Sequence, residues 1–228
     1  MAYEFNIQEG ESINYFVNSA EHILGRHKGK KGLLVDFGAH VGVLDVMAVR
    51  EEGFEFAIAV EPNLENFVRL VDNIQLNDCQ GYILPVWAAV SNQSYKTGVL
   101  YSNNQGVNSG IQSLNYKDYY PSENVCLVTM NNLLASTSWI DLLKIDIEGG
   151  EWDLFTPDNE HLFQKARWLD IELHHMELDK EIALDLYTGI DNSRKTAEEY
   201  LAGCGFKLTW NDETAGLYGP RKHGSNQN

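Results

Sequence analysis

Cysteines and basic residues are both scarce in this sequence of 228 residues. It has three cysteines, and 17 basic against 33 acidic residues, for a formal net charge of -16. Cys79, Cys126 and Cys204 are odd in number and form no C-x-x-C pair, which predicts free thiols and argues against a disulfide framework or a cysteine metal site. The excess of negative charge repels a phosphate backbone, so we do not expect nucleic acid as a partner or substrate.

Long apolar runs are also missing. No run approaches the ~20 residues that a membrane helix needs, and residues 1–5 lack the basic and apolar regions of a secretory signal. We therefore expect a cytoplasmic protein with no membrane span. A length of 228 residues suits one domain with a large core; we place it at residues 1–220, followed by a disordered tail at residues 221–228.

Short apolar segments alternate with helical ones along most of the chain, which is typical of βαβ units. The expected strands are residues 33–37, 56–60, one within 82–90, 142–147 and 168–174. The expected helices are residues 43–51, a helix that Asn63 caps with Phe67, Leu70, Val71 and Ile74 on one face, and residues around 196–202. The pattern predicts an α/β fold with a doubly wound, mostly parallel sheet.

Three further segments complete the expected fold. Residues 206–210 and 216–218 lie close enough in sequence to form a C-terminal antiparallel hairpin. Residues 91–129, rich in Asn, Ser, Gly and Tyr, predict an inserted β-hairpin with a mobile loop around residues 103–110. Residues 1–30 have apolar residues at helical spacing, which predicts a cap of one or two helices over a sheet edge or over the site.

Residues 33–42 predict a ligand site. An apolar strand ends there in a turn with Gly38 and Gly42 and leads into a helix, as in the nucleotide-binding corner of doubly wound sheets. A dinucleotide fingerprint would place glycines at positions 36 and 41, where this chain has Asp36 and Val41. A carboxylate there disfavours a pyrophosphate, and with it a nicotinamide-dependent dehydrogenase. It suits a ligand with an ammonium group, such as S-adenosylmethionine.

A second carboxylate fits the same ligand. Glu61 follows Asp36 by 25 positions, at the tip of the next expected strand. A carboxylate about 20 residues beyond the glycine turn accepts the hydroxyls of a ribose in such sheets. Taken alone, Glu61 reads more simply as a surface residue of a β–α turn, but its spacing from Asp36 and Gly38 favours ribose binding.

Four motifs, in this order, resemble the FkbM family of S-adenosylmethionine-dependent methyltransferases. They are LLVDFGAHVG at residues 33–42, VEPNLENF at 60–67, WAAVS at 87–91 and DLLKIDIEGGE at 141–151. The match covers about residues 33–168, and the last motif is the most specific. The resemblance implies a class I, Rossmann-like methyltransferase whose cofactor, S-adenosylmethionine, becomes S-adenosylhomocysteine. It also implies a hydroxyl acceptor on a sugar, a glycan or a secondary metabolite.

The resemblance further implies which residues contact the cofactor. The first motif would line its methionine and ribose side, Glu61 would hold the ribose, and the turn at residues 87–89 would flank the adenine. The expected cofactor-binding residues are Asp36, Gly38, Ala39, His40, Gly42, Glu61, Pro62, Trp87, Ala88, Ala89 and Asp146. The chain departs from the family's usual residues at His40, Gly150 and residues 130–132. The last departure is the motive for an alternative, a non-catalytic cofactor-binding protein of the same fold.

Charged residues alternate along two of the expected strands, so that each strand presents one charged face. These faces carry Lys144, Asp146 and Glu148, and Asp170, Glu172 and His174. An unpaired buried ammonium is costly. We therefore expect Lys144 to pair with Glu172 or Asp170.

The catalytic candidates lie at or just past the carboxyl ends of the fourth and fifth expected strands. Open α/β sheets bind ligands at this end, and methyl transfer to a hydroxyl gains roughly 10²–10⁴-fold from a general base. The candidate bases are Asp146, Glu148, His174 and His175, and Asp146 equally suits a role in positioning the cofactor. The spacing of these carboxylates and histidines is not diagnostic of a metal site, so we expect no metal.

Overall fold

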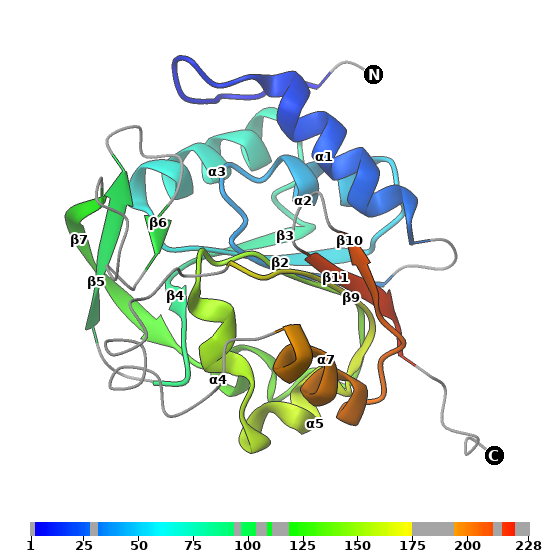
Figure 1. Ribbon diagram of the computed structural model, residues 1–228. Helices are drawn as coiled ribbons and strands as arrows, with labels where there is room; N and C mark the ends of the chain where they lie inside the picture. The colour runs from blue at the N-terminus through cyan, green and yellow to red at the C-terminus, as the bar shows by residue number, and fades with distance from the viewer. Residues whose placement is uncertain are drawn as a thin grey trace.

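The computed structural model describes residues 3–27, 32–93, 97–103, 109–110, 119–174, 194–211 and 216–221. A seven-stranded sheet lies at its centre, in the order β10-β11-β9-β8-β1-β2-β3 (Figure 1). Its strands are β1 Leu33–Phe37, β2 Phe56–Glu61, β3 Ile83–Trp87, β8 Ile140–Ile145, β9 Ala166–Glu172, β10 Thr209–Asn211 and β11 Gly216–Pro220. The five strands from β9 to β3 are parallel, and β11 is antiparallel to both neighbours. The expected α/β sheet and C-terminal hairpin are confirmed.

Helices cover both faces of this sheet (Figure 1). One face carries α1 Ile13–Gly25, α2 Val43–Arg50 and α3 Leu64–Leu76, and the other carries α4 Met130–Leu134, α5 Glu160–Phe163 and α7 Arg194–Gly203. Short 3-10 turns, η1 Gly150–Leu154 and η2 Pro157–Asn159, precede α5. The strands alternate between two apolar cores, as Leu34 and Val35 of β1 show by packing on opposite sides. None of the described helices has the length and apolar character needed to cross a membrane.

A second, four-stranded sheet corresponds to the expected insertion. It consists of β4 Ala89–Val90, β5 Thr97–Asn103, β6 Ser109–Gly110 and β7 Tyr119–Val128, in the order β4-β7-β5-β6. The antiparallel β5–β7 pair confirms the hairpin, while the expected mobile loop lies mostly outside the described residues. The strand expected within residues 82–90 is confirmed as β3, and a second short strand, β4, follows it within the same range. The chain leaves the central sheet at Ala88, which donates to the Glu61 carbonyl, and then pairs with β7.

Strand ends also differ from the sequence interpretation where loops begin. β8 ends at Ile145, two residues earlier than expected. Asp146 still donates its backbone N–H to the Phe37 carbonyl, but Glu148 has a positive φ of 53° and turns the chain away. The cap of α3 is as predicted, since the Asn63 side chain accepts from the Asn66 backbone N–H at 3.0 Å.

Candidate functional site

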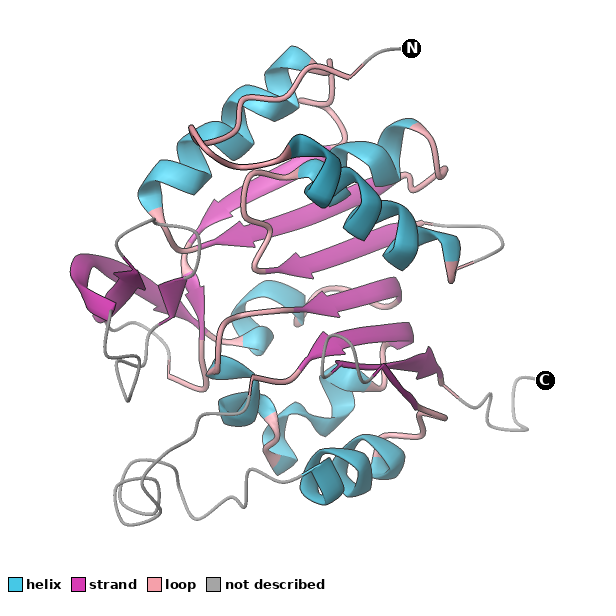
Figure 2. Ribbon diagram, turned by 45° about the horizontal axis from the view of Figure 1, so that its top comes forward, coloured by secondary structure: helices cyan, strands magenta, loops and turns pink. Residues whose placement is uncertain are grey.

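A cavity of about 340 Å³ opens at the carboxyl ends of the central parallel strands. These strand ends face the side of the molecule where the small sheet lies (Figure 2), and open α/β sheets bind their ligands at this edge. The predicted site residues that line the cavity are Asp36, Gly38, Ala39, His40, Glu61, Pro62, Ala88, Ala89, Asp146, Glu148 and His174. His175 lies outside the described residues.

Two predicted cofactor residues do not line the cavity. A Cβ added to Gly42 would lie 2.3 Å from Leu70 of α3, so this glycine permits close packing of the turn against the helix. Trp87 is 43% exposed, stacks on Phe67 with centroids 6.4 Å apart and donates its Nε1–H to the Pro62 carbonyl at 2.9 Å. Gly42 therefore serves packing against α3, and Trp87 lies at the surface, bonded to Pro62 of the cavity lining.

The glycine turn after β1 is held tightly by its neighbours. Gly38 has φ +88°, and a Cβ there would lie 1.8 Å from the backbone oxygen of Asp146. The N–H groups of Gly38 and Ala39 both donate to the Val60 carbonyl, at 2.9 and 3.0 Å. The sequence reasoning that gave this glycine a conformational role is supported by its geometry.

Glu61 lies at the end of β2 with its carboxylate fixed by two backbone donors. Oε2 accepts from the His40 N–H and Oε1 from the Asn63 N–H, both at 2.9 Å. The side chain is only 5% exposed, and burial raises its pKa to about 7. Glu61 thus lines the cavity as a rigid acceptor.

The expected partners of Lys144 are wrong. Asp36, Lys144 and Asp170 are aligned across β1, β8 and β9, yet Lys144 Nζ lies 3.1 Å from Asp36 and 3.5 Å from Asp146. Asp170 is 2.5 Å from Arg26, the residue that follows α1, instead. The sequence could not show that Arg26 pairs with Asp170, so that Lys144 pairs with Asp36 on the opposite neighbouring strand.

Asp36 is therefore paired with a cation of the protein itself, Lys144, rather than left for the ammonium group of a ligand. It is 1% exposed, and burial raises its pKa although Lys144 acts to lower it. Lys144 also donates to the Gly38 carbonyl at 2.7 Å. Asp36 holds Lys144, and Lys144 holds the glycine turn, so this carboxylate shapes the site from beneath.

An acidic cluster surrounds His174 at the other side of the cavity. His174 Nδ1 donates to Glu151 Oε1 at 3.0 Å, while Nε2 faces Glu148 at 3.6 Å and Asp146 and Glu172 at 3.9 Å. Burial opposes protonation of His174, but the bond to Glu151 and the nearby negative charges raise its pKa to about 10. Burial raises the pKa of Glu148 and of Glu172 to about 7.

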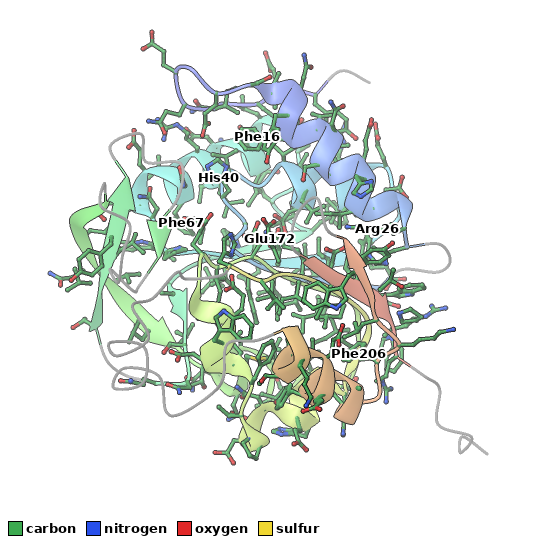
Figure 3. All side chains as sticks on the ribbon, viewed as in Figure 1. Phe16, Arg26, His40, Phe67, Glu172 and Phe206 are labelled. Carbon is green, nitrogen blue, oxygen red and sulfur yellow. The ribbon has the colours of Figure 1, made fainter. Side chains whose placement is uncertain are left out.

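The helical cap contributes residues that sequence reasoning did not single out for the site. Tyr15, Phe16 and Ile23 of α1 line the cavity, and Phe16 lies over His40 with ring centroids 5.0 Å apart (Figure 3). Burial and the charge of Lys144 lower the pKa of His40 to about 4, so it is neutral at pH 7. Helical spacing indicated the apolar face of this cap; no sequence signal indicated Asn66, which also lines the cavity.

These groups make the unliganded protein less stable as the pH rises. A raised pKa in the folded state gives stability that is lost as the pH rises through it. For Glu61 and Glu148 this stability is lost between about pH 4.5 and 7, and for His174 between about pH 6.5 and 10. The loss is on the order of 3 kcal/mol for the nearly buried Glu61. The free energy of unfolding, measured with urea in the presence of EDTA, should therefore fall steadily from pH 5 to pH 7 and pH 9.

The control for this decline separates the site from overall charge. Glu148→Gln should flatten the part of the curve between pH 5 and 7. Glu21→Gln removes one exposed charge from α1 and should leave its slope unchanged. Equal slopes for the two variants would show that general charge repulsion, rather than the buried site, sets the pH dependence.

The comparisons with known proteins agree with this geometry. The model of the methyltransferase FkbM domain matches residues 36–208, and no curated protein matches. A methyltransferase FkbM structure from Methylobacillus flagellatus KT has a TM-score of 0.52 and 15% identity over 86% of this chain and 45% of its own, so this chain spans less than half of that protein. The METTL16 MTase domain has a TM-score of 0.51 and 14% identity over 95% of this chain and 71% of its own. These structures share the class I Rossmann-like fold, and the domain match shows that the chain belongs to the FkbM methyltransferase family.

Proposed function

We propose that this protein transfers a methyl group from S-adenosylmethionine to a hydroxyl of a sugar, a glycan or a secondary metabolite. The observation that supports this most is the composition of one cavity. It brings the Gly38 turn and Glu61 together with Asp146, Glu148 and His174. The first pair suits a nucleoside, and the three others suit the binding and deprotonation of an acceptor.

The residues present fit the cofactor. The glycine at position 38 lets the turn lie against the Asp146 backbone at the edge of the cavity, and the fixed carboxylate of Glu61 suits the two ribose hydroxyls. Asp36 is buried and already paired, whereas the Asp146 side chain is 33% exposed and lines the cavity. Asp146 is therefore the carboxylate that would hold the cofactor's ammonium, and Asp36 is a positioning residue.

The chemistry requires a base on the acceptor side. The cofactor supplies an electrophilic methyl group: the acceptor oxygen bonds to the methyl carbon, the C–S electron pair stays on sulfur, and the hydroxyl proton must be accepted. Glu148, with its pKa near 7, is the carboxylate suited to take that proton. His174, protonated at neutral pH, would orient Glu148 by its charge.

The charge of the site supports an acceptor without phosphate groups. Four carboxylates surround His174, in a chain of net charge -16, and both features repel a nucleic acid backbone. The METTL16 likeness concerns the fold alone. The free thiol of Cys126, which is exposed, supports a cytoplasmic location.

Cofactor binding gives the first test. Isothermal titration should show that wild-type protein binds S-adenosylhomocysteine and that Glu61→Ala weakens binding about 10-fold or more, since hydrogen bonds to a charged group contribute about 1.5–3 kcal/mol. Glu65→Ala is the matched control, because Glu65 is a nearby carboxylate in the first turn of α3 whose side chain is 65% exposed. No binding by the wild type, or equal losses in both variants, would contradict the proposal.

Turnover separates the proposed enzyme from the non-catalytic alternative. Release of S-adenosylhomocysteine should be measured with a panel of sugars, glycans and hydroxylated metabolites. Glu148→Gln should reduce turnover by about 10²-fold or more with S-adenosylhomocysteine affinity unchanged. Binding without turnover on any acceptor would favour a cofactor-binding protein that does not catalyse.

A further inference from the structure

We propose that Asp146, Glu148 and His174 bind one divalent transition-metal ion, of the Mn²⁺ or Zn²⁺ type, inside the cavity. Each residue offers one ligand atom, and these three atoms all lie within 4.8 Å of one another. The three residues come from separate places in the fold: the end of β8, the loop after it, and the residue two beyond the end of β9. The set therefore combines one imidazole nitrogen with carboxylate oxygens.

The spacing of the ligand atoms suits an ion between them. Nε2 of His174 is 3.6 Å from Glu148 Oε2 and 3.9 Å from Asp146 Oδ1, too far for hydrogen bonds. Ligands about 2.1 Å from a metal lie roughly 3.4 Å apart in a tetrahedral site, and between about 3.0 and 4.2 Å apart in an octahedral one. The two separations from Nε2 lie between these values, and the Asp146 and Glu148 ligand oxygens lie within 4.8 Å of each other.

Glu151 fixes which nitrogen faces the ion. This side chain is fully buried and accepts hydrogen bonds from the backbone N–H of Ile147 and of Gly149 as well as from His174 Nδ1. With Nδ1 so engaged, Nε2 points at Asp146 and Glu148. Metal-binding histidines almost always donate their other ring N–H to a carboxylate or carbonyl in this way.

The protonated His174 ring is the cation nearest to these carboxylates, and a metal ion at Nε2 would take the place of its proton. Asp146, Glu148, Glu151 and Glu172 all lie within 4 Å of the His174 ring nitrogens. The one lysine in contact with this group, among the described residues, is Lys144, and its nearest carboxylate is Asp36. A divalent ion would balance the remaining negative charge, as bound cations do in such sites.

The ligand set indicates the kind of ion and leaves it an open side. Imidazole suits transition metals and carboxylates suit harder ions, so a mixed set favours Mn²⁺ or Zn²⁺ over Ca²⁺. Three protein ligands leave coordination positions toward the cavity, as in catalytic metal sites. If the proposed function holds, the acceptor hydroxyl would take one of these positions. Asp146 and Glu148 would then be ligands, in place of the ammonium-binding and base roles that they have without the ion, and Glu172 would be the carboxylate left to take the proton.

This proposal departs from the expectation of no metal. In the sequence, Glu148 and His174 are 26 positions apart and follow no ligand spacing. The parallel neighbours β8 and β9 bring them together, and the turn at Glu148, with its positive φ, directs that side chain back toward His174.

Metal binding can be measured without any reaction. Wild-type protein treated with EDTA and then exchanged into EDTA-free buffer should bind one equivalent of Mn²⁺, followed by loss of the free-ion EPR signal. Pulsed EPR of the bound ion should show coupling to an imidazole nitrogen. His174→Gln should lose this coupling and weaken Mn²⁺ binding at least 10-fold, because loss of an outer-shell partner alone costs about 10–100-fold.

Matched variants keep the test decisive. His161→Gln changes an exposed histidine of α5, and Glu21→Gln an exposed carboxylate of α1; both should bind Mn²⁺ as the wild type does, whereas Glu148→Gln should not. Circular dichroism identifies any variant that fails to fold. If one does, the coupling of Mn²⁺ to an imidazole nitrogen in the wild-type protein is the test of the site. Absent or diffuse Mn²⁺ binding without nitrogen coupling would overturn the site. Titration with S-adenosylhomocysteine is independent, so its failure would contradict the proposed function and leave the metal site standing.

Discussion

Gly38→Ala should abolish cofactor binding and destabilise the fold more than an ordinary glycine substitution. Its φ of +88° is unfavourable for alanine, which costs about 1–2 kcal/mol. Its Cβ would also lie 1.8 Å from the backbone oxygen of Asp146. That oxygen cannot rotate away, because it shares a peptide plane with the Ile147 N–H, which donates to the buried Glu151 Oε1 at 2.9 Å. The ends of β1 and β8 would have to separate, and the cavity lies between them and β2.

Gly53→Ala is the matched control for this variant. Gly53 has a similar φ of +75°, but nothing lies within 4 Å of the Cβ it would gain. It should therefore show the cost of the backbone conformation alone, about 1–2 kcal/mol, with S-adenosylhomocysteine affinity unchanged. Urea unfolding and isothermal titration of both variants give the comparison. If Gly38→Ala were no worse than Gly53→Ala, the close approach to Asp146 would have no energetic importance.

The sequence predicts the central sheet well because its strands are short, apolar and bounded by turns. The limits of β1 are correct to the residue, and Glu61 ends β2 inside the cavity as its spacing from Asp36 indicates. The resemblance implies that Trp87 and Gly42 contact the cofactor, but neither is among the residues that line the cavity. Local sequence shows that a residue belongs to a turn; the packing of α3 against that turn decides which way it faces.

The pairing of charged residues could not be predicted for a different reason. Lys144 has registered carboxylates on both neighbouring strands, Asp36 on β1 and Asp170 on β9, and nothing local distinguishes them. Arg26, 144 positions from Asp170 in the sequence, makes the choice. The cluster at His174 depends in the same way on Glu151 and Glu148, whose positions follow from the turn after β8.

Lys144→Met should reduce the free energy of unfolding by about 3–5 kcal/mol, because removing one partner of a buried ion pair leaves an uncompensated charge. Asp36 is 1% exposed and would lose the cation 3.1 Å away, and the Gly38 carbonyl would lose its donor. The loss should grow with pH. A carboxyl whose folded-state pKa is raised loses stability as the pH rises, and removal of Lys144 raises the pKa of Asp36 further. Urea unfolding of variant and wild type at pH 5 and pH 8 measures both effects.

The double variant Asp36→Asn/Lys144→Met distinguishes an ion pair from simple loss of packing. With both charges removed, most of the lost stability should return, since replacing a buried pair by neutral residues is often close to neutral. The dependence of the loss on pH should disappear with it. If the double variant were as unstable as Lys144→Met at both pH values, then the stem of Lys144 and its bond to Gly38, rather than the charge of Asp36, would be what supports the turn. Lys144 would then stabilise the Gly38 turn by packing and by one hydrogen bond. Its charge would have no part in the stability of the fold.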